Sequence, residues 1–281
     1  DGTVTNSERR ISRQRAFLAG PGEARADWWQ ITEVAKRLGF GAAFAYDSPA
    51  AIFAEHARLS AFGNNGSRDF DIGQWSDIDG AGYDVLAPTL WPQPMGGSGR
   101  QRFFADGRFF TPDGRARFIA TAYTAPAAAT SPEWPLVLNT GRIRDQWHTM
   151  TRTGKSPRLS AHIFEPFAEI HPDDAANLGL EQGGLTRLTS AWGSMIARVK
   201  ITPDQRRGSV FAPMHWTGEF ASHGRVNALV NPAVDAISGQ PESKHTPIRA
   251  EALKPRWQAF VLTRTPVAHP ENTFCVEGHA G

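Results

Sequence analysis

The sequence predicts an α+β protein whose C-terminal half consists of short β-strands arranged as a closed barrel or a sandwich. Glycine (27) and proline (20) are plentiful among the 281 residues, which suits short strands joined by many turns. Residues 185–191, 194–202 and 209–216 alternate apolar and polar side chains and are separated by turn residues. Two amphipathic segments, 27–39 and 48–63, predict helices in the N-terminal half. Strands at this spacing indicate a barrel or sandwich with one or two inserted helices.

The first predicted helix covers residues 27–39. Its spacing places Trp28, Ile31, Ala35 and Leu38 on one face, and the segment ends in a glycine suited to the position after a helix. We therefore expect this face to pack against a core.

The second predicted helix covers residues 48–63. Ser48 can cap its N-terminus and Pro49 fits the first turn.

Residues 64–100 are rich in Asn, Asp, Gly and Pro and predict a long irregular segment. The aromatic runs and Asp-Gly turns of residues 102–120 predict a β-hairpin.

A small, proline-rich and almost uncharged segment over residues 126–134 marks a linker. We therefore predict a partial α/β region over residues 1–125 and a second domain over 135–281. The second domain begins with a strand at 135–141 and has another at 167–172, which a short helix follows.

Composition excludes several classes of protein. The formal net charge is +2, too mild a bias to indicate a nucleic-acid partner. No apolar run approaches the roughly 20 residues of a membrane-spanning helix, so no membrane segment is predicted. The single cysteine, Cys275, cannot form an internal disulfide or a thiolate cluster. The chain starts at Asp1 without a methionine, so we expect it to be a piece of a longer protein.

Familiar catalytic motifs do not account for the chain. GxSxG and HExxH are absent, and the nine histidines are too scattered to indicate a metal site. Residues 154–156 (GKS) end like a phosphate-binding P-loop, but Thr149 stands where the first glycine is required and Pro157 follows at once.

Residues 140–159, called the basic loop below, form the most distinctive segment. Cations outnumber the single acid, Asp145, and hydroxyl groups lie between them. The cations are Arg142, Arg144, Arg152, Lys155 and Arg158. Guanidinium groups bind phosphate bidentately, and hydroxyls and loop amides complete such a site. The pattern predicts a polyanion-binding loop, although a solvated basic surface loop has the same composition.

Four motifs resemble one known family: residues 2–10 (GTVTNSERR), 138–162 (LNTGRIRDQWHTMTRTGKSPRLSAH), 169–180 (EIHPDDAANLGL) and 225–245 (RVNALVNPAVDAISGQPESKH). In order and spacing they resemble the C-terminal part of the catalytic subunit of assimilatory-type molybdenum nitrate reductases, which carry a bis-molybdopterin guanine dinucleotide cofactor. The resemblance implies a six-stranded double-psi barrel, the molybdopterin dinucleotide-binding domain, after part of an incomplete central domain.

The resemblance also implies cofactor-binding residues. They lie in the basic loop and near the C-terminal end of the barrel: Thr140, Gly141, Arg142, Gln146, His148, Thr149, Met150, Thr151, Arg152, Asn227 and Lys244. Without the family, Asn227 reads as a turn-capping residue and Lys244 as a surface lysine.

For two further groups of residues the sequence leaves two interpretations, a role at the cofactor and a purely structural role. His215 and Trp216 end a strand on the side where the family approaches the cofactor, and a buried core histidine is at least as good an interpretation. In the first motif, four residues either line the substrate funnel or form a capped, salt-bridged turn: Thr5, Asn6, Glu8 and Arg9.

The resemblance implies no catalytic residue and no metal ligand in this chain. It implies instead a molybdenum ligand and a [4Fe-4S] cluster in a missing N-terminal part, so we expect the chain alone to be inactive. Nitrate would be the substrate, a ferredoxin, a flavodoxin or an NADH-linked reductase subunit the electron donor, and the cytoplasm the location. A formate dehydrogenase fragment and a stand-alone, non-catalytic cofactor-binding subunit remain as alternatives.

Overall fold

The fold, taken from a computed structural model, is described for residues 1–97, 99, 102–264, 268 and 273–278. The chain forms two compact units, Asp1–Thr121 and Ala122–Gly281, each with its own hydrophobic core. Residues 122–135, which include the predicted linker, contain no helix or strand.

The first unit contains a small antiparallel sheet in the order β1-β2-β3. Strand β1 (Gly2–Thr5) pairs with β2 (Arg10–Gln14), and β2 pairs with β3 (Thr89–Leu90). The helical segments between β2 and β3 are α1 (Asp27–Ala35), η1 (Lys36–Phe40), α2 (Pro49–Ala61), η2 (Gly73–Trp75) and α3 (Gly80–Asp84).

Helix α2 confirms the second predicted helix. The Ser48 hydroxyl accepts a hydrogen bond from the Ala51 amide at 3.3 Å, and Pro49 occupies the first turn. Phe53 and Ala57 of this helix are buried in the core of the unit. The cap and the apolar face therefore agree with the sequence.

Helix α1 differs from its prediction. It ends at Ala35, and η1 follows, in which Gly39 has a φ of 91°. The face predicted to be buried is largely exposed, with Ile31 at 63% and Leu38 at 68% exposure. The helical spacing therefore predicted the helix correctly, but it did not predict that most of the apolar face is exposed.

The predicted hairpin over residues 102–120 is wrong. These residues form turns and irregular chain without a strand. Their aromatic side chains pack on one another instead: Phe104 stacks on Phe109 at 4.6 Å, and Phe103 lies 5.5 Å from Trp91 between ring centroids. Aromatic clustering has replaced the cross-strand pairing that the sequence pattern indicated.

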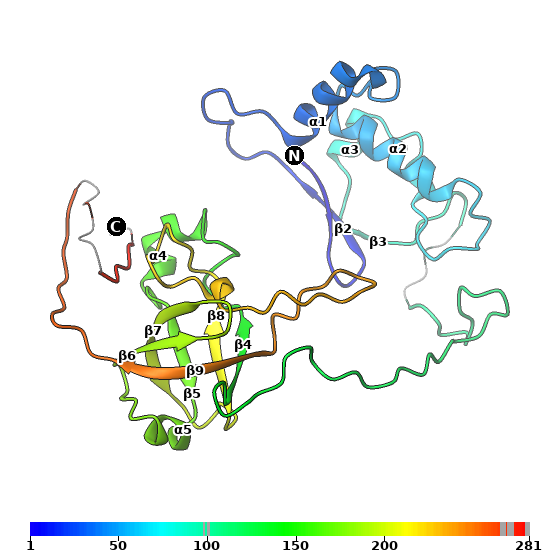
Figure 1. The fold of residues 1–281 in the computed structure, drawn as a ribbon. Helices are drawn as coiled ribbons and strands as arrows, with labels where there is room; N and C mark the ends of the chain where they lie inside the picture. The colour runs from blue at the N-terminus through cyan, green and yellow to red at the C-terminus, as the bar shows by residue number, and fades with distance from the viewer. Residues whose placement is uncertain (98, 100–101, 265–267, 269–272, 279–281) are drawn as a thin grey trace. The chain divides into compact units, whose positions relative to one another are not determined.

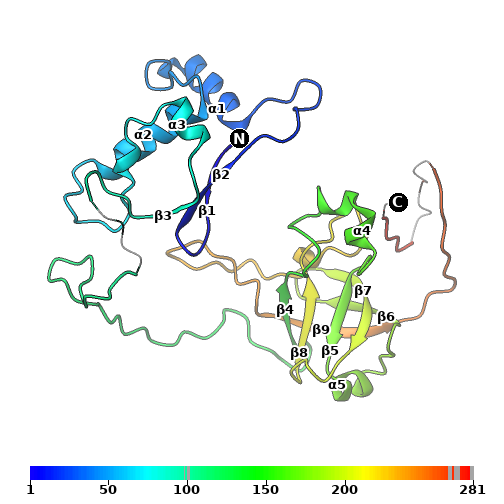
Figure 2. The same cartoon turned by 180° about the vertical axis from the view of Figure 1, so that it is seen from behind.

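The second unit is a closed barrel of six strands in the order β4-β8-β5-β7-β6-β9 (Figures 1 and 2). The strands are β4 (Leu136–Gly141), β5 (Phe167–Ile170), β6 (Leu185–Thr189), β7 (Ser194–Ile201), β8 (Ser209–Pro213) and β9 (Thr246–Leu253). Two pairs, β4–β8 and β5–β7, are parallel, and β4–β9 closes the barrel in the antiparallel sense. The predicted six-stranded barrel is confirmed.

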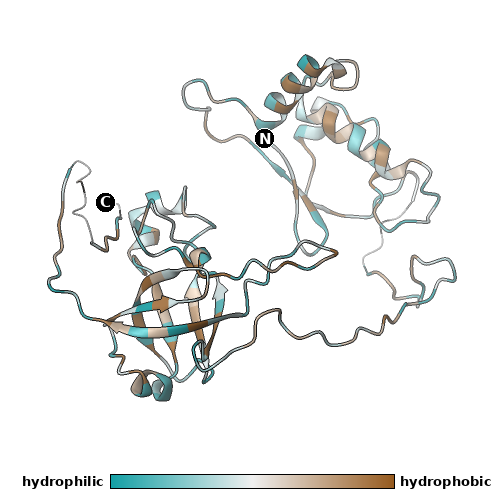
Figure 3. Ribbon diagram, viewed as in Figure 1, coloured by the Kyte–Doolittle hydropathy of each residue, from teal (hydrophilic) through white to brown (hydrophobic). Residues whose placement is uncertain are grey.

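Hydrophobic and hydrophilic residues are interspersed along the strands of the barrel (Figure 3), and the buried hydrophobic ones form its core. Leu138, Leu188, Val199 and Ile248 point inward and are almost fully buried, while polar neighbours point outward. Strand β9 was not predicted, because its proline, alanines and charged residues give a weak strand signal.

The two ends of the barrel carry different structures. Helix α5 (Pro172–Asn177) lies at one end, where His171 Nδ1 accepts a hydrogen bond from the Asp173 amide. The basic loop, with η3 (Thr153–Lys155) and α4 (Pro157–Ser160), lies at the other end (Figure 1).

Candidate functional site

The basic loop continues directly from strand β4, whose last residues are Thr140 and Gly141. Two loop residues, His148 and Met150, have positive φ angles of 43° and 63°. Residues other than glycine rarely adopt this left-handed conformation, because it brings the Cβ atom close to the backbone. The loop backbone is therefore strained, and contacts from the barrel must hold it in place.

The single acid of the loop is neutralised within the loop's own surroundings. Arg144 donates to Asp145 at 2.9 Å, and His162 Nδ1 lies 2.6 Å from the same carboxylate. The hydrogen bond from Arg144 is the main cause that lowers the pKa of Asp145 below its ordinary value. The Asp145 carboxylate is therefore already paired, and it does not balance the positive charge of the remaining cations of the loop.

Those remaining cations are exposed and form no ion pair with any residue that the structure describes: Arg142, Arg152, Lys155 and Arg158. The Arg142 guanidinium lies 4.9 Å from the Trp147 ring centroid, which orients it without neutralising it. Uncompensated guanidinium groups at the end of a barrel strand form a favourable site for a phosphate-bearing ligand.

Gln146 supplies a buried hydrogen-bond donor. It is 4% exposed, and its Oε1 accepts from the Thr153 hydroxyl at 2.7 Å. Its Nε2 is buried and has no partner among the described residues. A buried N–H group without an acceptor costs about 1–3 kcal/mol. This orphan donor therefore fits a polar ligand that supplies an acceptor at the loop.

Thr140 and Lys244, 104 residues apart, are brought together. Lys244 Nζ donates to the Thr140 carbonyl, and the buried Thr140 hydroxyl donates to the Ser243 carbonyl at 2.9 Å. Lys244 is therefore tied to the end of β4 and is more than a free surface lysine. The Thr140 side chain serves this tie and is 5% exposed.

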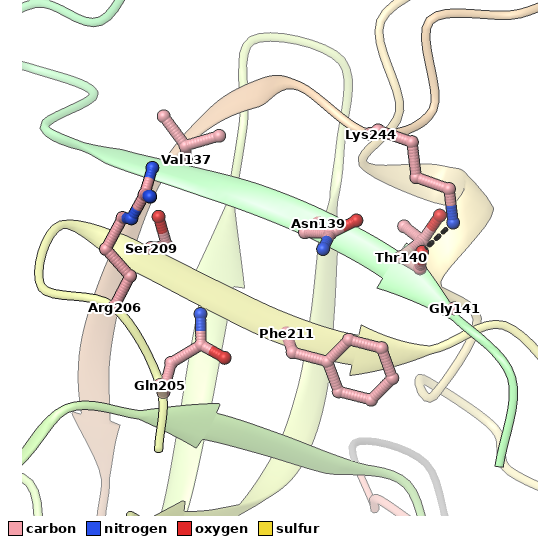
Figure 4. Close-up of a pocket in the computed structure, with 9 residues that line it drawn as sticks. All are labelled: Val137, Asn139, Thr140, Gly141, Gln205, Arg206, Ser209, Phe211 and Lys244. Atoms are coloured by element: carbon pink, nitrogen blue, oxygen red, sulfur yellow. Dashed lines mark hydrogen bonds between the residues drawn. The ribbon is translucent and has the colours of Figure 1, made fainter. Parts of the chain in front are cut away.

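A cavity of about 670 Å³ lies on the outer face of β4 and β8 (Figure 4). Arg206 and Lys244 provide positive charge, and none of the lining residues is acidic: Val137, Asn139, Thr140, Gly141, Gln205, Arg206, Ser209, Phe211 and Lys244. A Cβ atom on Gly141 would lie 2.6 Å from the Phe211 ring, so this position requires glycine or a displaced ring. The sequence indicated Thr140, Gly141 and Lys244 as site residues; Asn139 lies in the same motif but was not singled out, and the other lining residues belong to no motif and were missed.

The basic loop rests on an apolar cluster formed by Met150, Trp216, Phe220 and Ala221, called the loop-support cluster below. Residues 273–278 return to this cluster, where Ala221 bridges Val276 and Phe274 packs alongside. The Met150 side chain is therefore occupied in packing, and its backbone is hydrogen-bonded within the loop, to the Trp147 carbonyl and the Gly154 amide.

His215 and Trp216 are buried at 0% and 1% exposure. The His215 ring contacts the backbone of the basic loop at two residues, Ile143 and His148. The core interpretation of this histidine is therefore confirmed, with a specific role in holding the loop. The Trp216 Nε1 group is buried without a partner among the described residues.

The other predicted residues lie at the surface. His148, Thr149 and Thr151 are exposed on the loop. Asn227 is exposed on η4 (Val226–Ala228), and its side chain forms no hydrogen bond with a described residue, so it does not cap a turn there.

The motif at residues 2–10 forms a capped turn between β1 and β2. The Asn6 side chain accepts from the amides of Glu8 and Arg10, both at 3.0 Å. The Arg9 guanidinium donates to the Trp91 carbonyl and lies 4.3 Å from the Phe103 ring centroid. Glu8 forms no ion pair with a described residue, so the turn is held by Asn6 rather than by the expected salt bridge.

The described residues contain neither a candidate membrane span nor a candidate metal-binding cluster. No helix there is long and apolar enough to cross a membrane. No group of three or more His, Cys, Asp or Glu side chains comes together there in a way that could hold a metal ion.

Comparison with known proteins agrees with the loop chemistry. Residues 136–247 match the molydopterin dinucleotide binding domain. The chain is 49% identical over 269 residues to a nitrate reductase of Klebsiella oxytoca, covering 96% of this chain and 31% of that protein. It is 32% identical to the F420-dependent formate dehydrogenase subunit alpha of Methanocaldococcus jannaschii, covering 90% of this chain and 35% of that protein.

A solved structure supports the fold. Acetylene hydratase from Pelobacter acetylenicus superimposes with a TM-score of 0.63 at 15% identity, over 89% of this chain and 36% of that one. The chain thus spans about a third of the length of the relatives it matches. The closed barrel, the basic loop and these matches show that the chain belongs to the molybdopterin oxidoreductases and carries their molydopterin dinucleotide binding domain.

Proposed function

We propose that the basic loop holds the dinucleotide part of molybdopterin guanine dinucleotide in an enzyme that reduces nitrate to nitrite. The observation that carries the proposal is the pair of exposed guanidinium groups, Arg142 and Arg152, without a carboxylate partner among the described residues. They lie in the loop that leaves the barrel within the matched domain. When bound, the molybdenum centre of this cofactor supplies the two-electron chemistry.

Each part of the loop has a different task in this proposal. The two arginines bind the pyrophosphate, because guanidinium groups pair bidentately with phosphate oxygens. Gly141 lets the ligand approach the backbone closely. The orphan Gln146 Nε2 donates to a polar edge of the pterin, for which amide donors are suited.

The remaining residues complete the site. His148, Thr149 and Thr151 offer exposed polar groups, Met150 anchors the loop on the loop-support cluster, and Thr140 and Lys244 fix the end of β4. Asn227 extends the site from η4.

Nitrate is favoured as the substrate by the relatives. The nitrate reductase of Klebsiella oxytoca is 49% identical to this chain, against 32% for the formate dehydrogenase subunit of Methanocaldococcus jannaschii. The assimilatory nitrate reductase catalytic subunit of Bacillus subtilis, at 33%, is about as similar to this chain as that formate dehydrogenase subunit, at 32%. Formate oxidation is therefore the second candidate, and assays of the full-length protein with each substrate distinguish them.

The proposal extends to the parts of the protein outside this chain. A molybdenum ligand and a [4Fe-4S] cluster would lie there, and electrons would arrive from a ferredoxin, a flavodoxin or an NADH-linked reductase subunit. The enzyme would work in the cytoplasm in nitrate assimilation. This chain would contribute one wall of the cofactor site and would be inactive alone.

Substitution of the two arginines tests the role of the loop. Arg142→Ala and Arg152→Ala in the full-length protein should each lower the bound molybdenum and pterin about tenfold or more, because each removes a charge-assisted phosphate contact worth about 1.5–3 kcal/mol. Metal analysis and pterin fluorescence after oxidation measure the cofactor content.

Arg187→Ala is the matched control, since it removes an exposed arginine from strand β6 of the same barrel. Its cofactor content should equal that of the wild type. Full cofactor content in both loop variants would contradict the proposal.

A further inference from the structure

His215 is a buried histidine whose ring contacts the backbone of the basic loop. It follows strand β8 by two residues and its ring is fully buried, at 0% exposure. The Ile143 amide donates to Nε2 at 2.9 Å, and Nδ1 lies 2.7 Å from the His148 carbonyl oxygen. One ring therefore bridges two backbone positions of the loop that are five residues apart.

These two partners fix the protonation state of the ring. A carbonyl oxygen can only accept, so Nδ1 carries the hydrogen. An amide N–H can only donate, so Nε2 must be unprotonated. Both contacts therefore require the neutral tautomer with hydrogen on Nδ1, and an imidazolium ring would break the contact with Ile143.

The bridged segment needs such a restraint. His148 lies in the left-handed region at a φ of 43°, a conformation that costs energy for a side chain with a Cβ atom. The loop-support cluster holds the following part of the loop through Met150, and Gly154 lies against Phe220. In the first half, the ring of His215 hydrogen-bonds the backbone at two positions, beside single contacts from Lys244 to the Thr140 carbonyl and from the Trp147 amide to the Thr153 hydroxyl.

We infer that His215 is a positioning residue that sets the shape of the basic loop, and through it the placement of Arg142, Gln146 and His148 for cofactor binding. Its complete burial keeps it from touching a ligand itself. The shape of the loop depends on the two hydrogen bonds alone, whereas the effect on cofactor binding rests on the proposed function.

The surroundings favour the neutral ring. Burial is the main cause that lowers the pKa of His215 below its ordinary value of 6.5, against a raising contribution from the His148 carbonyl. Arg142 and His148 are the charged or titratable groups that act on the ring, and both lower its pKa further. The bridge is therefore intact at neutral pH and weakens as the pH falls below 6.5, because protons then bind preferentially to the open form.

The test measures the loop directly by amide hydrogen exchange on the full-length protein. In His215→Leu the Ile143 amide should exchange at least tenfold faster than in the wild type. The amide of Val199, which donates to the Gly184 carbonyl at 2.8 Å in the barrel, is the internal reference and should not change. His215→Gln keeps one donor and one acceptor and should restore most of the protection.

A pH series separates positioning from plain packing. In the wild type, the protection of Ile143 relative to Val199 should decline below pH 6.5, and in His215→Gln it should stay flat. His171→Gln, at the opposite end of the barrel beside α5, is the matched histidine control and should behave as the wild type. Unchanged exchange at Ile143 in His215→Leu would overturn the inference, and so would equal loss in the Leu and Gln variants.

Cofactor content of the same variants distinguishes the inference from the proposed function. Loss of cofactor in His215→Leu with recovery in His215→Gln supports both. Normal content in His215→Leu, together with loss in Arg142→Ala, overturns the positioning role and leaves the proposed function intact. Normal content in Arg142→Ala and Arg152→Ala overturns the proposed function, and the exchange data alone then decide the role of His215 in loop shape.

Discussion

At the scale of single residues, the basic loop depends on contacts that its composition does not reveal. Gly154 has the sequence context of a phosphate-binding glycine, yet it is buried against the loop-support cluster. A Cβ atom there would lie 2.8 Å from the Phe220 ring and 3.1 Å from the Met150 Cβ. The glycine is needed for packing of the loop onto the barrel.

Gly154→Ala should therefore lower the free energy of unfolding of the barrel unit by about 1–3 kcal/mol, since Phe220 and Met150 are buried and cannot move aside freely. Chemical denaturation measures this change. Gly218→Ala is the control, because a Cβ atom at Gly218 meets nothing within 4 Å. Equal stability of the two variants would contradict the packing role.

Residue identity predicted the site only in part. The excess of arginine and threonine in the loop indicated an anion site, and the family resemblance supplied its ligand. Neither could show that Lys244 reaches Thr140 or that Gln146 and Met150 turn inward, because these placements follow from the closing of the barrel and from two left-handed residues. Long-range pairing of this kind leaves no local pattern in the sequence.

At the scale of elements, local signals were reliable where a strand or helix contains its own determinants. Strands β6, β7 and β8 alternate clearly, and α2 begins with a serine and a proline, so all four were predicted. Strand β9 owes its conformation to pairing with β4 and β6 rather than to its own residues. The hairpin prediction for residues 102–120 was wrong for the opposite reason. The residues have a strand-like pattern, but their aromatic side chains pack on one another in the cluster around Phe104.

The cap of α2 provides a test at this scale. Ser48→Ala should lower the stability of the first unit by about 1 kcal/mol, because the Ala51 amide loses its acceptor. Ser48→Asp keeps an acceptor at the cap and should preserve stability. Thermal unfolding followed by circular dichroism at 222 nm distinguishes the variants, and an unchanged midpoint for Ser48→Ala would argue against the cap.

At the scale of the whole molecule, the two units differ in how much core they bury. Among the described residues, the main barrel core contains sixteen buried hydrophobic residues and the core of the first unit seven. The first unit also exposes large apolar side chains on its helices, including Ile31, Leu38 and Phe62. Less buried apolar surface means less hydrophobic stabilisation.

Separate expression of the two units should reflect this difference. Residues 122–281 should unfold cooperatively, whereas residues 1–121 should be markedly less stable and bind an apolar dye such as ANS. Calorimetry and dye fluorescence measure the two properties. A cooperative transition of residues 1–121 at or above the midpoint of the barrel would contradict this expectation.

The way in which the barrel closes also bears on how the site comes into being. Strand β4 carries the basic loop and is the first strand of the barrel to leave the ribosome, but both of its partners, β8 and β9, come late in the chain. Pairing across such distances is slow, because a long stretch of chain must be ordered before the contact forms. The strand that carries the basic loop is therefore made early but can pair only after β8 and β9 have been synthesised, so the end of β4 from which the loop leaves is fixed only when most of the barrel sequence is present.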